Sequence, residues 1–229
     1  MPYFYFDTYY LFLVVPALLI ALWAQINVST TFRKYNNVRN VRGITADEAA
    51  RYILDDNGLY SVRIERVSGN LSDHYDPRSN VIRLSDSTYG NSSVGAIGVA
   101  AHEVGHAIQH ATGYLPIKIR QAIIPITQIG STIAIPLAVL GIIMSWDILI
   151  TIGILLFCAV VLFQLITLPV EFNASNRALK TLENKNILEG RELAGAKKVL
   201  RAAALTYVAA LLVAIANLVR LIALSNRRR

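Results

Sequence analysis

Long apolar runs dominate the pattern of hydrophobic and polar positions along this chain. A helix needs about 20 apolar residues to cross a bilayer, and four runs reach that length. They are Tyr9–Ile26, Ile123–Met144, Ile148–Leu168 and Ala202–Leu224. The pattern therefore predicts a membrane protein with about four transmembrane helices, which would be embedded in a lipid bilayer.

Three of these runs have individual features. No Lys or Arg precedes the first run and no convincing small-residue cleavage site follows it, so we expect an uncleaved anchor and not a signal peptide. Pro125 and Pro136 predict a kink in the second run. The fourth contains Asn217 and Arg220, so an amphipathic helix packed on the others is an alternative to a span.

The polar segment after the first run reads as a small α+β domain. Thr45 and Glu48 form a capping box for a short helix within Gly43–Gly58. Three stretches with alternating apolar and polar residues predict a short antiparallel sheet. These stretches are Tyr60–Val67, Leu71–Asp76 and Val81–Ser85.

The positive charges predict the orientation in the membrane. Residues 27–121 contain 11 Lys and Arg and residues 169–201 contain 7, which makes 18 of the 22 in the chain. Two apolar runs separate these segments, so both lie on one side, and the positive-inside rule makes that side the cytoplasm. We expect a multi-pass protein of the cytoplasmic membrane. Arg220 and Arg227–Arg229 oppose the rule if the fourth run spans.

Composition excludes some classes of function. The residues are 54% hydrophobic, and the net charge is +7. The Lys and Arg residues gather in the segments on one side of the membrane and are not interleaved with aromatic residues in the way that is typical of a nucleic-acid-binding surface. No nucleic-acid partner is therefore expected. Cys158 is the single cysteine, which excludes an intrachain disulfide and a cysteine-based zinc site.

The segment Val99–Gly113, VAAHEVGHAIQHATG, carries the candidate chemistry. His102 and His106 are four residues apart, so on a helix both imidazoles lie on one face and can bind one Zn²⁺. Glu103 stands beside the first of them, where it can take a proton from a water activated by the metal. Ser92 or Ser93 can cap this helix, and Gly113 can end it.

A catalytic zinc usually has three protein ligands and one open position. His110 lies one further turn along the same helix, beyond the reach of an ion held by His102 and His106. Glu171 is the better candidate, because it follows the third run on the same side of the membrane as the two histidines. Its alternative role is to stabilise the N-terminus of a helix that begins there.

These residues predict a zinc-dependent endopeptidase with a protein or peptide substrate, for which membrane proteins are one option. Glu103 would act as general base, with His102, His106 and Glu171 as metal ligands. His74, Tyr75 and Arg177 are unranked candidates for binding substrate or stabilising the oxyanion. Neither the natural substrate nor the oligomeric state follows from the sequence.

Nearly the whole chain resembles the bacterial membrane zinc metallopeptidases of the YugP type. The resemblance rests on LSDHYDPRSNVIRLS at 71–85, VAAHEVGHAIQHA at 99–111 and LPVEFNASNRAL at 168–179. More distantly the chain is similar to the HtpX- and Ste24-type membrane proteases, and the resemblance implies the same ligands and general base. Asn173 stands where the YugP-type family usually carries Asp, and Ser175 stands where the Ste24-like pattern carries an Asp that would orient a ligating histidine.

The expected fold class is an α+β membrane protein with a small zincin-like cytoplasmic domain. It divides into an anchor, a metallopeptidase domain, a helix pair, a cytoplasmic helical segment with the third ligand, and a last helix with a basic tail. The bounds are 1–27, 28–121, 122–168, 169–201 and 202–229. Two rival functions are a site-2-type intramembrane protease and a non-catalytic scaffold stabilised by zinc.

Overall fold

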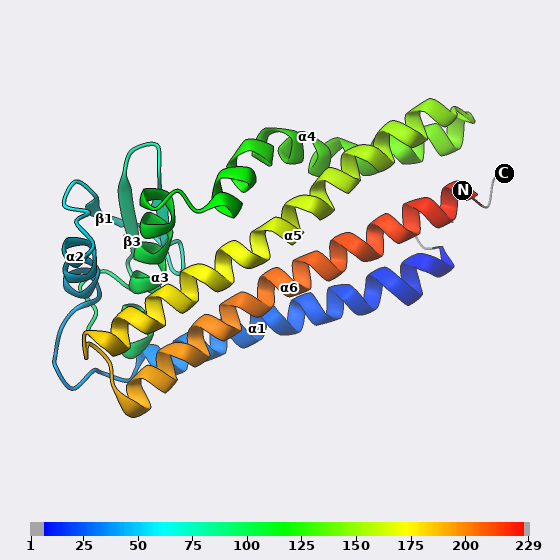
Figure 1. The fold of residues 1–229 in the computed structure, drawn as a ribbon. Coiled ribbons are helices and arrows are strands. Elements are labelled where there is room, and N and C mark those ends of the chain that lie inside the picture. The colour runs from blue at the N-terminus through cyan, green and yellow to red at the C-terminus, as the bar shows by residue number, and fades with distance from the viewer. Residues whose placement is uncertain (1–6, 227–229) are drawn as a thin grey trace. The chain divides into compact units, whose positions relative to one another are not determined.

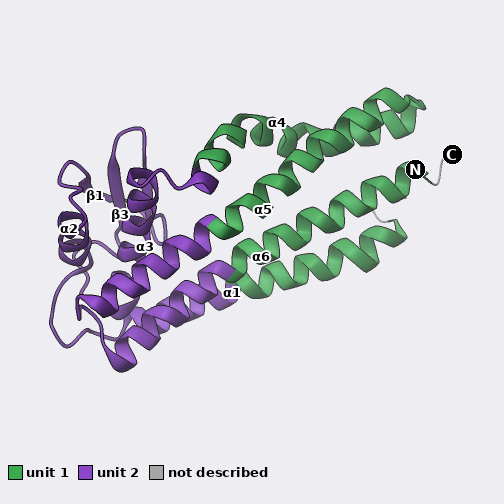
Figure 2. Ribbon diagram, viewed as in Figure 1, with its two compact units in different colours: residues 1–25, 118–169, 205–229 green, residues 26–117, 170–204 purple. Residues whose placement is uncertain are grey.

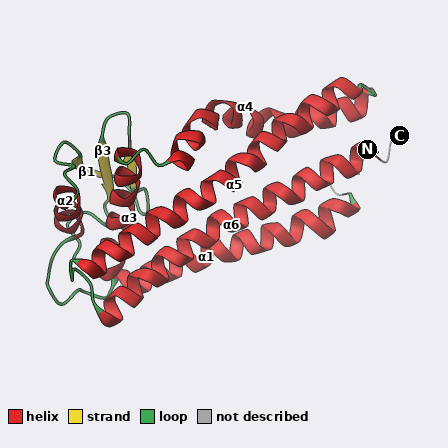
Figure 3. Ribbon diagram, in the orientation of Figure 1, coloured by secondary structure: helices red, strands yellow, loops and turns green. Residues whose placement is uncertain are grey.

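The computed structural model describes residues 7–226, and Figures 1 and 3 show the order and type of the elements. The first six residues of the predicted anchor and Arg227–Arg229 of the predicted basic tail lie outside the described residues. A π-helical turn leads into the first helix, and the other helices and strands follow it along the chain. They are η1 (Tyr10–Val14), α1 (Val15–Asn36), α2 (Ala46–Asp56), β1 (Arg63–Val67), β2 (His74–Asp76), β3 (Val81–Ser85), α3 (Val94–Ala111), α4 (Leu115–Met144), α5 (Asp147–Asn184) and α6 (Gly190–Asn226).

The predicted fold class is confirmed as a mostly helical α+β fold of the membrane type. Four helices among the described residues are long and apolar enough to cross a membrane. They are Tyr10–Asn36, Leu115–Met144, Asp147–Asn184 and Gly190–Asn226, and each contains one of the four predicted runs or nearly all of it. A three-stranded sheet and two shorter helices complete the fold.

The chain forms two compact units, coloured separately in Figure 2. Unit 1 comprises residues 1–25, 118–169 and 205–229, which hold most of the apolar runs. Unit 2 comprises residues 26–117 and 170–204 and contains the sheet, α2 and α3. The buried core of unit 2 joins apolar side chains of α2, β3 and α3, such as Ile53, Ile82 and Ile97.

The sheet is mixed, which corrects the prediction of an antiparallel sheet. Its strand order is β1-β3-β2, with β1 parallel to β3 and β2 antiparallel to β3. The central strand β3 is therefore buried at Val81, Ile82, Leu84 and Ser85, so both of its faces are covered. Its alternating sequence had suggested a half-buried strand instead.

The loop between β1 and β2 explains this topology. It carries the chain past the end of β3 and shortens the predicted second strand to three residues. The loop is tied to that end of β3, because the backbone N–H of Gly69 donates to the carboxylate of Asp86 and Asp73 accepts from the backbone N–H and hydroxyl of Ser85. Leu71 adopts a positive φ of 55° within the loop, a conformation that a strand residue does not have.

The predicted helix caps are present. Thr45 and Glu48 form the capping box of α2. Of the two predicted serines, Ser93 caps α3, where its hydroxyl accepts from the N–H of Ala96 at 3.1 Å. Gly113 follows α3 with a φ of 64°, as expected of a residue that ends a helix in the left-handed conformation.

One helix boundary was predicted wrongly. We expected a cytoplasmic helix to begin near Glu171, but α5 is continuous from Asp147 to Asn184 with Pro169 inside it. A proline removes one N–H from a helix, and long membrane helices tolerate this loss. Glu171 therefore lies well inside a helix, and the alternative in which it stabilises a helix N-terminus does not hold.

In unit 1, Arg220 of α6 pairs with Asp7. The Nε and one terminal nitrogen of Arg220 each lie 2.8 Å from the Oδ2 atom of Asp7, and both side chains are about nine-tenths buried. The guanidinium also lies 5.1 Å from the centre of the Tyr10 ring. One of the positive charges that opposed the positive-inside rule, that of Arg220, is thus neutralised within unit 1.

Candidate metal centre

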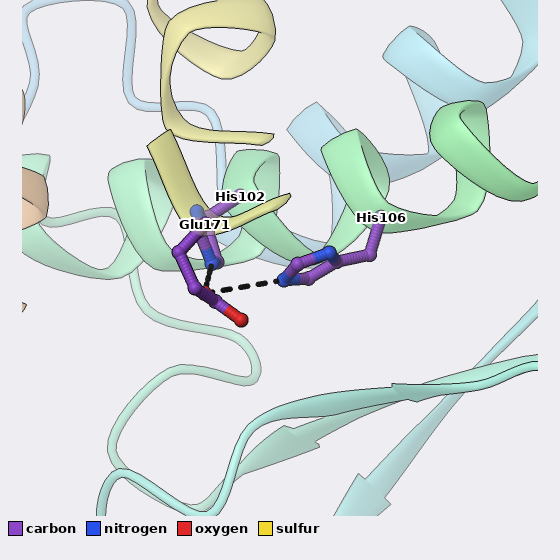
Figure 4. Close-up of side chains that lie close together, drawn as sticks. All are labelled: His102, His106 and Glu171. Carbon is purple, nitrogen blue, oxygen red and sulfur yellow. Dashed lines mark hydrogen bonds and ion pairs between the residues drawn. The ribbon is translucent and has the colours of Figure 1, made fainter. Parts of the chain in front are cut away.

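Three side chains of unit 2 converge where α3 meets α5. His102 and His106 project from α3 and Glu171 from α5, and Figure 4 shows both imidazoles directed at the carboxylate. The Oε2 atom of Glu171 lies 3.2 Å from Nε2 of His102 and 3.6 Å from Nε2 of His106. One ligand atom from each residue lies within 4.8 Å of the others, so the group can hold a metal ion.

Close packing of the two helices brings these side chains together. Gly105 lies between the histidines on α3, and a β-carbon added there would be 2.6 Å from the carbonyl oxygen of Ala174 on α5. Only a glycine allows this approach, because such a distance is far below van der Waals contact. Nearer the start of α3, Gly98 meets Ala196 of α6 more loosely, at 3.2 Å for an added β-carbon.

The second ring nitrogen of each histidine has its own partner. Nδ1 of His106 lies 3.0 Å from Oε1 of Gln109, and Nδ1 of His102 lies 3.1 Å from the hydroxyl of Ser175. Both Nε2 atoms are thereby directed toward Glu171. Metal-binding histidines commonly use one ring nitrogen for the ion and the other for such a hydrogen bond.

In this group two hydrogen-bond acceptors face each other, which favours a cation between them. An amide oxygen can only accept, so His106 donates its Nδ1 proton to Gln109 and, when neutral, presents a lone pair to Glu171. Burial opposes protonation of His106, but the hydrogen bond to Glu171 and the charges of Glu103 and Glu171 outweigh it, so the pKa of His106 is raised. A proton or a metal ion removes the repulsion between the two acceptors.

The donor set fits zinc. Two imidazole nitrogens and one carboxylate oxygen form a ligand set of catalytic zinc sites, which keep a fourth position open. Within residues 7–226 no fourth His, Cys, Asp or Glu joins the group. A structural zinc site would normally be closed by four protein ligands.

Glu103 lies beside the cluster and is held by the edge strand. The residue is 8% exposed, and its Oε2 atom accepts the backbone N–H of Tyr75 on β2 at 2.9 Å. β2 is one of the two edge strands of the sheet. The contact connects β2 directly to the helix that carries His102 and His106.

The other predicted site residues have separate partners. His74 is exposed, and its Nδ1 lies 2.8 Å from the carbonyl oxygen of Ser72. The hydroxyl of Tyr75 donates to Asn80 at 3.0 Å, and its ring meets the ring of His110 edge-on. Arg177 donates from Nε to Asn173 at 2.8 Å. His110 is not part of the His102, His106 and Glu171 group.

Gln109 was not predicted from the sequence. It stands three residues after His106, so the helix repeat alone makes it a neighbour of that histidine, and this spacing was the available signal. Ser175 did stand out in the sequence, as a position where similar families carry Asp. The structure pairs Ser175 with His102.

An α+β membrane-type fold with a cluster of side chains that can hold a metal ion fits a metalloprotein of the membrane. Comparison with known proteins identifies the family. The family model described as "Putative neutral zinc metallopeptidase" matches residues 10–226, so the chain belongs to this family. The chain is 47% identical over 213 residues to "Putative membrane protease YugP" of Bacillus subtilis (strain 168), an alignment that covers 93% of this chain and 95% of that protein. No solved structure gives a significant match.

Proposed function

We propose that this protein is a membrane-bound zinc endopeptidase whose ligands are His102, His106 and Glu171. The observation that carries the proposal is the convergence of these three donors, with ligand atoms within 4.8 Å of one another, in a chain of the zinc metallopeptidase family. When bound, zinc supplies a Lewis acid that polarises a peptide carbonyl and makes water more acidic.

Glu103 is the general base in this proposal. The N–H of Tyr75 holds Oε2, so Oε1 takes a proton from the attacking water and passes it to the leaving amine. His102, Glu171 and His106 hold the metal and do not transfer protons. His74, Tyr75 and Arg177 stay predicted candidates for oxyanion stabilisation, although each has a hydrogen-bond partner of its own.

The distribution of basic residues supports an active site on the cytoplasmic side of the cytoplasmic membrane. All three ligands and Glu103 belong to unit 2, and the predicted metallopeptidase domain 28–121 and the segment 169–201 lie mostly within it. This favours hydrolysis outside the apolar runs over a site-2-type reaction within the bilayer. The absence of a fourth ligand among the described residues favours catalysis over a zinc-stabilised scaffold.

The test is a Glu103→Gln substitution in the full chain, purified in detergent and assayed on fluorescently labelled casein. The amide cannot take the proton, so hydrolysis should fall by at least about a hundredfold while the zinc content stays at the wild-type level. Glu183→Gln, on an exposed position of α5, is the matched control and should keep full activity. A Glu103→Gln variant that still cleaves casein would contradict the assignment of the base.

A further inference from the structure

Gln109 is a polar side chain with 0% exposure, buried where α3 meets α5. A buried amide must find hydrogen-bond partners for its oxygen and its nitrogen, or it destabilises the fold. Here the Nε2 atom donates to the carbonyl oxygen of Val170 at 2.8 Å and to Oδ1 of Asn173 at 3.0 Å. The Oε1 atom is left for His106.

The direction of each hydrogen bond in this group is determined. The carbonyl of Val170 can only accept, so the nitrogen of Gln109 must face α5 and its oxygen must face His106. Arg177 can only donate, and its Nε lies 2.8 Å from Oδ1 of Asn173, so the oxygen of Asn173 must face Arg177 and Gln109. A guanidinium on one helix thus sets the orientation of an imidazole on another.

His102 has no such constraint. Its Nδ1 faces the hydroxyl of Ser175, which can donate or accept. The hydroxyl therefore suits either tautomer of His102, whereas the oxygen of Gln109 suits only a His106 ring that carries its proton on Nδ1. The two histidines of the group differ in this respect.

We infer that Gln109 is the positioning residue of His106, and that Asn173 and Arg177 hold its amide in the required orientation. Gln109 keeps the proton of His106 on Nδ1 and the lone pair of Nε2 directed at the metal position. Through Val170 it also fixes the backbone next to Glu171, and so aligns two ligands at once. This inference rests on the proposed zinc site.

Zinc affinity of the full chain in detergent tests the inference, measured by competition with a chromophoric chelator. The Co²⁺-substituted protein supplies an absorption spectrum that reports the ligand geometry. Gln109→Met keeps the side-chain volume but removes all three hydrogen bonds, so zinc affinity should fall about ten- to a hundredfold and the Co²⁺ spectrum should change. Ile108→Val, a neighbouring packing change at a buried position, should alter neither.

A second pair of variants acts at a half-buried position outside the core. Asn173→Asp keeps an oxygen that accepts from Gln109 and Arg177, whereas Asn173→Ala does not. We expect affinity within about twofold of wild type for the first and a loss of about fivefold or more for the second. If Gln109→Met does not fold, the difference between these two variants still tests whether the hydrogen-bonded amide of Gln109 positions His106.

The outcomes separate the inference from the function on which it rests. A folded Gln109→Met protein with wild-type zinc affinity and Co²⁺ spectrum would overturn the role of Gln109. Equal affinities for Asn173→Asp and Asn173→Ala would overturn the role of Asn173. Wild-type protein that binds no zinc would contradict the proposed function itself.

Discussion

The backbone of Gly105 packs against that of Ala174 so closely that an added methyl group would lie 2.6 Å from the Ala174 carbonyl oxygen. We predict that Gly105→Ala separates α3 from α5 and lowers zinc affinity at least about tenfold, with a loss of about 1–3 kcal/mol in stability. Zinc titration and thermal unfolding of the purified protein measure both effects.

Gly98→Ala is the matched control for this prediction. Its added β-carbon would lie 3.2 Å from the β-carbon of Ala196, so α3 and α6 need to separate by only a few tenths of an ångström there, away from the contact of α3 with α5. We expect zinc affinity close to that of the wild type. Equal losses of zinc affinity in the two glycine variants would show that close packing at the site is not what positions the ligands.

Asp76, at the end of β2, supports a prediction about pH. Its carboxylate accepts hydrogen bonds from the Ser79 hydroxyl, the Arg78 N–H and the Arg83 guanidinium, which lower its pKa from 3.8 to about 2. A folded-state pKa below the unfolded value adds stability that is complete above about pH 4 and disappears as the pH falls through about 2. Asp76→Asn should therefore lower the unfolding temperature at pH 7 but hardly at pH 2.

This measurement is made with a chelator present, so that acid release of metal does not contribute. Unfolding temperatures of the wild type and Asp76→Asn are compared from pH 7 to about pH 2, and the difference should shrink through the lower half of that range. A difference that is the same at every pH would mean that the Asp76 hydrogen bonds do not depend on its charge.

The ion pair of Asp7 and Arg220 in unit 1 is the basis of a third prediction. Both side chains are about nine-tenths buried, so removing one partner leaves an uncompensated charge in an apolar environment. We expect Asp7→Asn or Arg220→Met alone to cost about 3–5 kcal/mol in unfolding free energy. The double variant Asp7→Asn with Arg220→Met should recover much of that loss, as unfolding in mixed detergent micelles can measure.

Additive losses in the double variant would contradict this account of the pair. The prediction also bears on the fourth apolar run, whose Arg220 opposed the positive-inside rule. A positive charge neutralised by Asp7 is no obstacle to placing that end of α6 in the membrane, and α6 is long and apolar enough to span it.

Much of the fold could be predicted from local sequence patterns. Apolar length predicted the four membrane-type helices, and the capping residues Thr45 and Ser93 correctly marked the starts of α2 and α3. The parallel pairing of β1 with β3 was not predictable in this way. It depends on Asp73 and Asp86 tying a loop across the end of β3, and these contacts join residues 12 to 17 positions apart.

The candidate site likewise has features that local sequence patterns predicted and features that they did not. The helix period alone predicted that His102 and His106 share one face. The distribution of basic residues predicted that Glu171 lies on the same side of the membrane, and the three side chains do converge. The continuity of α5 through Pro169 and the contact of Gly105 with Ala174 are tertiary features that no local pattern encodes. The contact between Glu103 and the N–H of Tyr75 likewise depends on how β2 lies against α3.

The zinc content of purified wild-type protein, compared with Glu171→Ala and His110→Ala, tests the central claim most directly. Glu171 faces both His102 and His106, whereas the centre of the His110 ring lies 5.4 Å from that of Tyr75. We predict about one zinc ion per chain in the wild type and in His110→Ala, and its loss in Glu171→Ala. Zinc retained by Glu171→Ala but lost from His110→Ala would contradict the proposed centre and the reaction assigned to it.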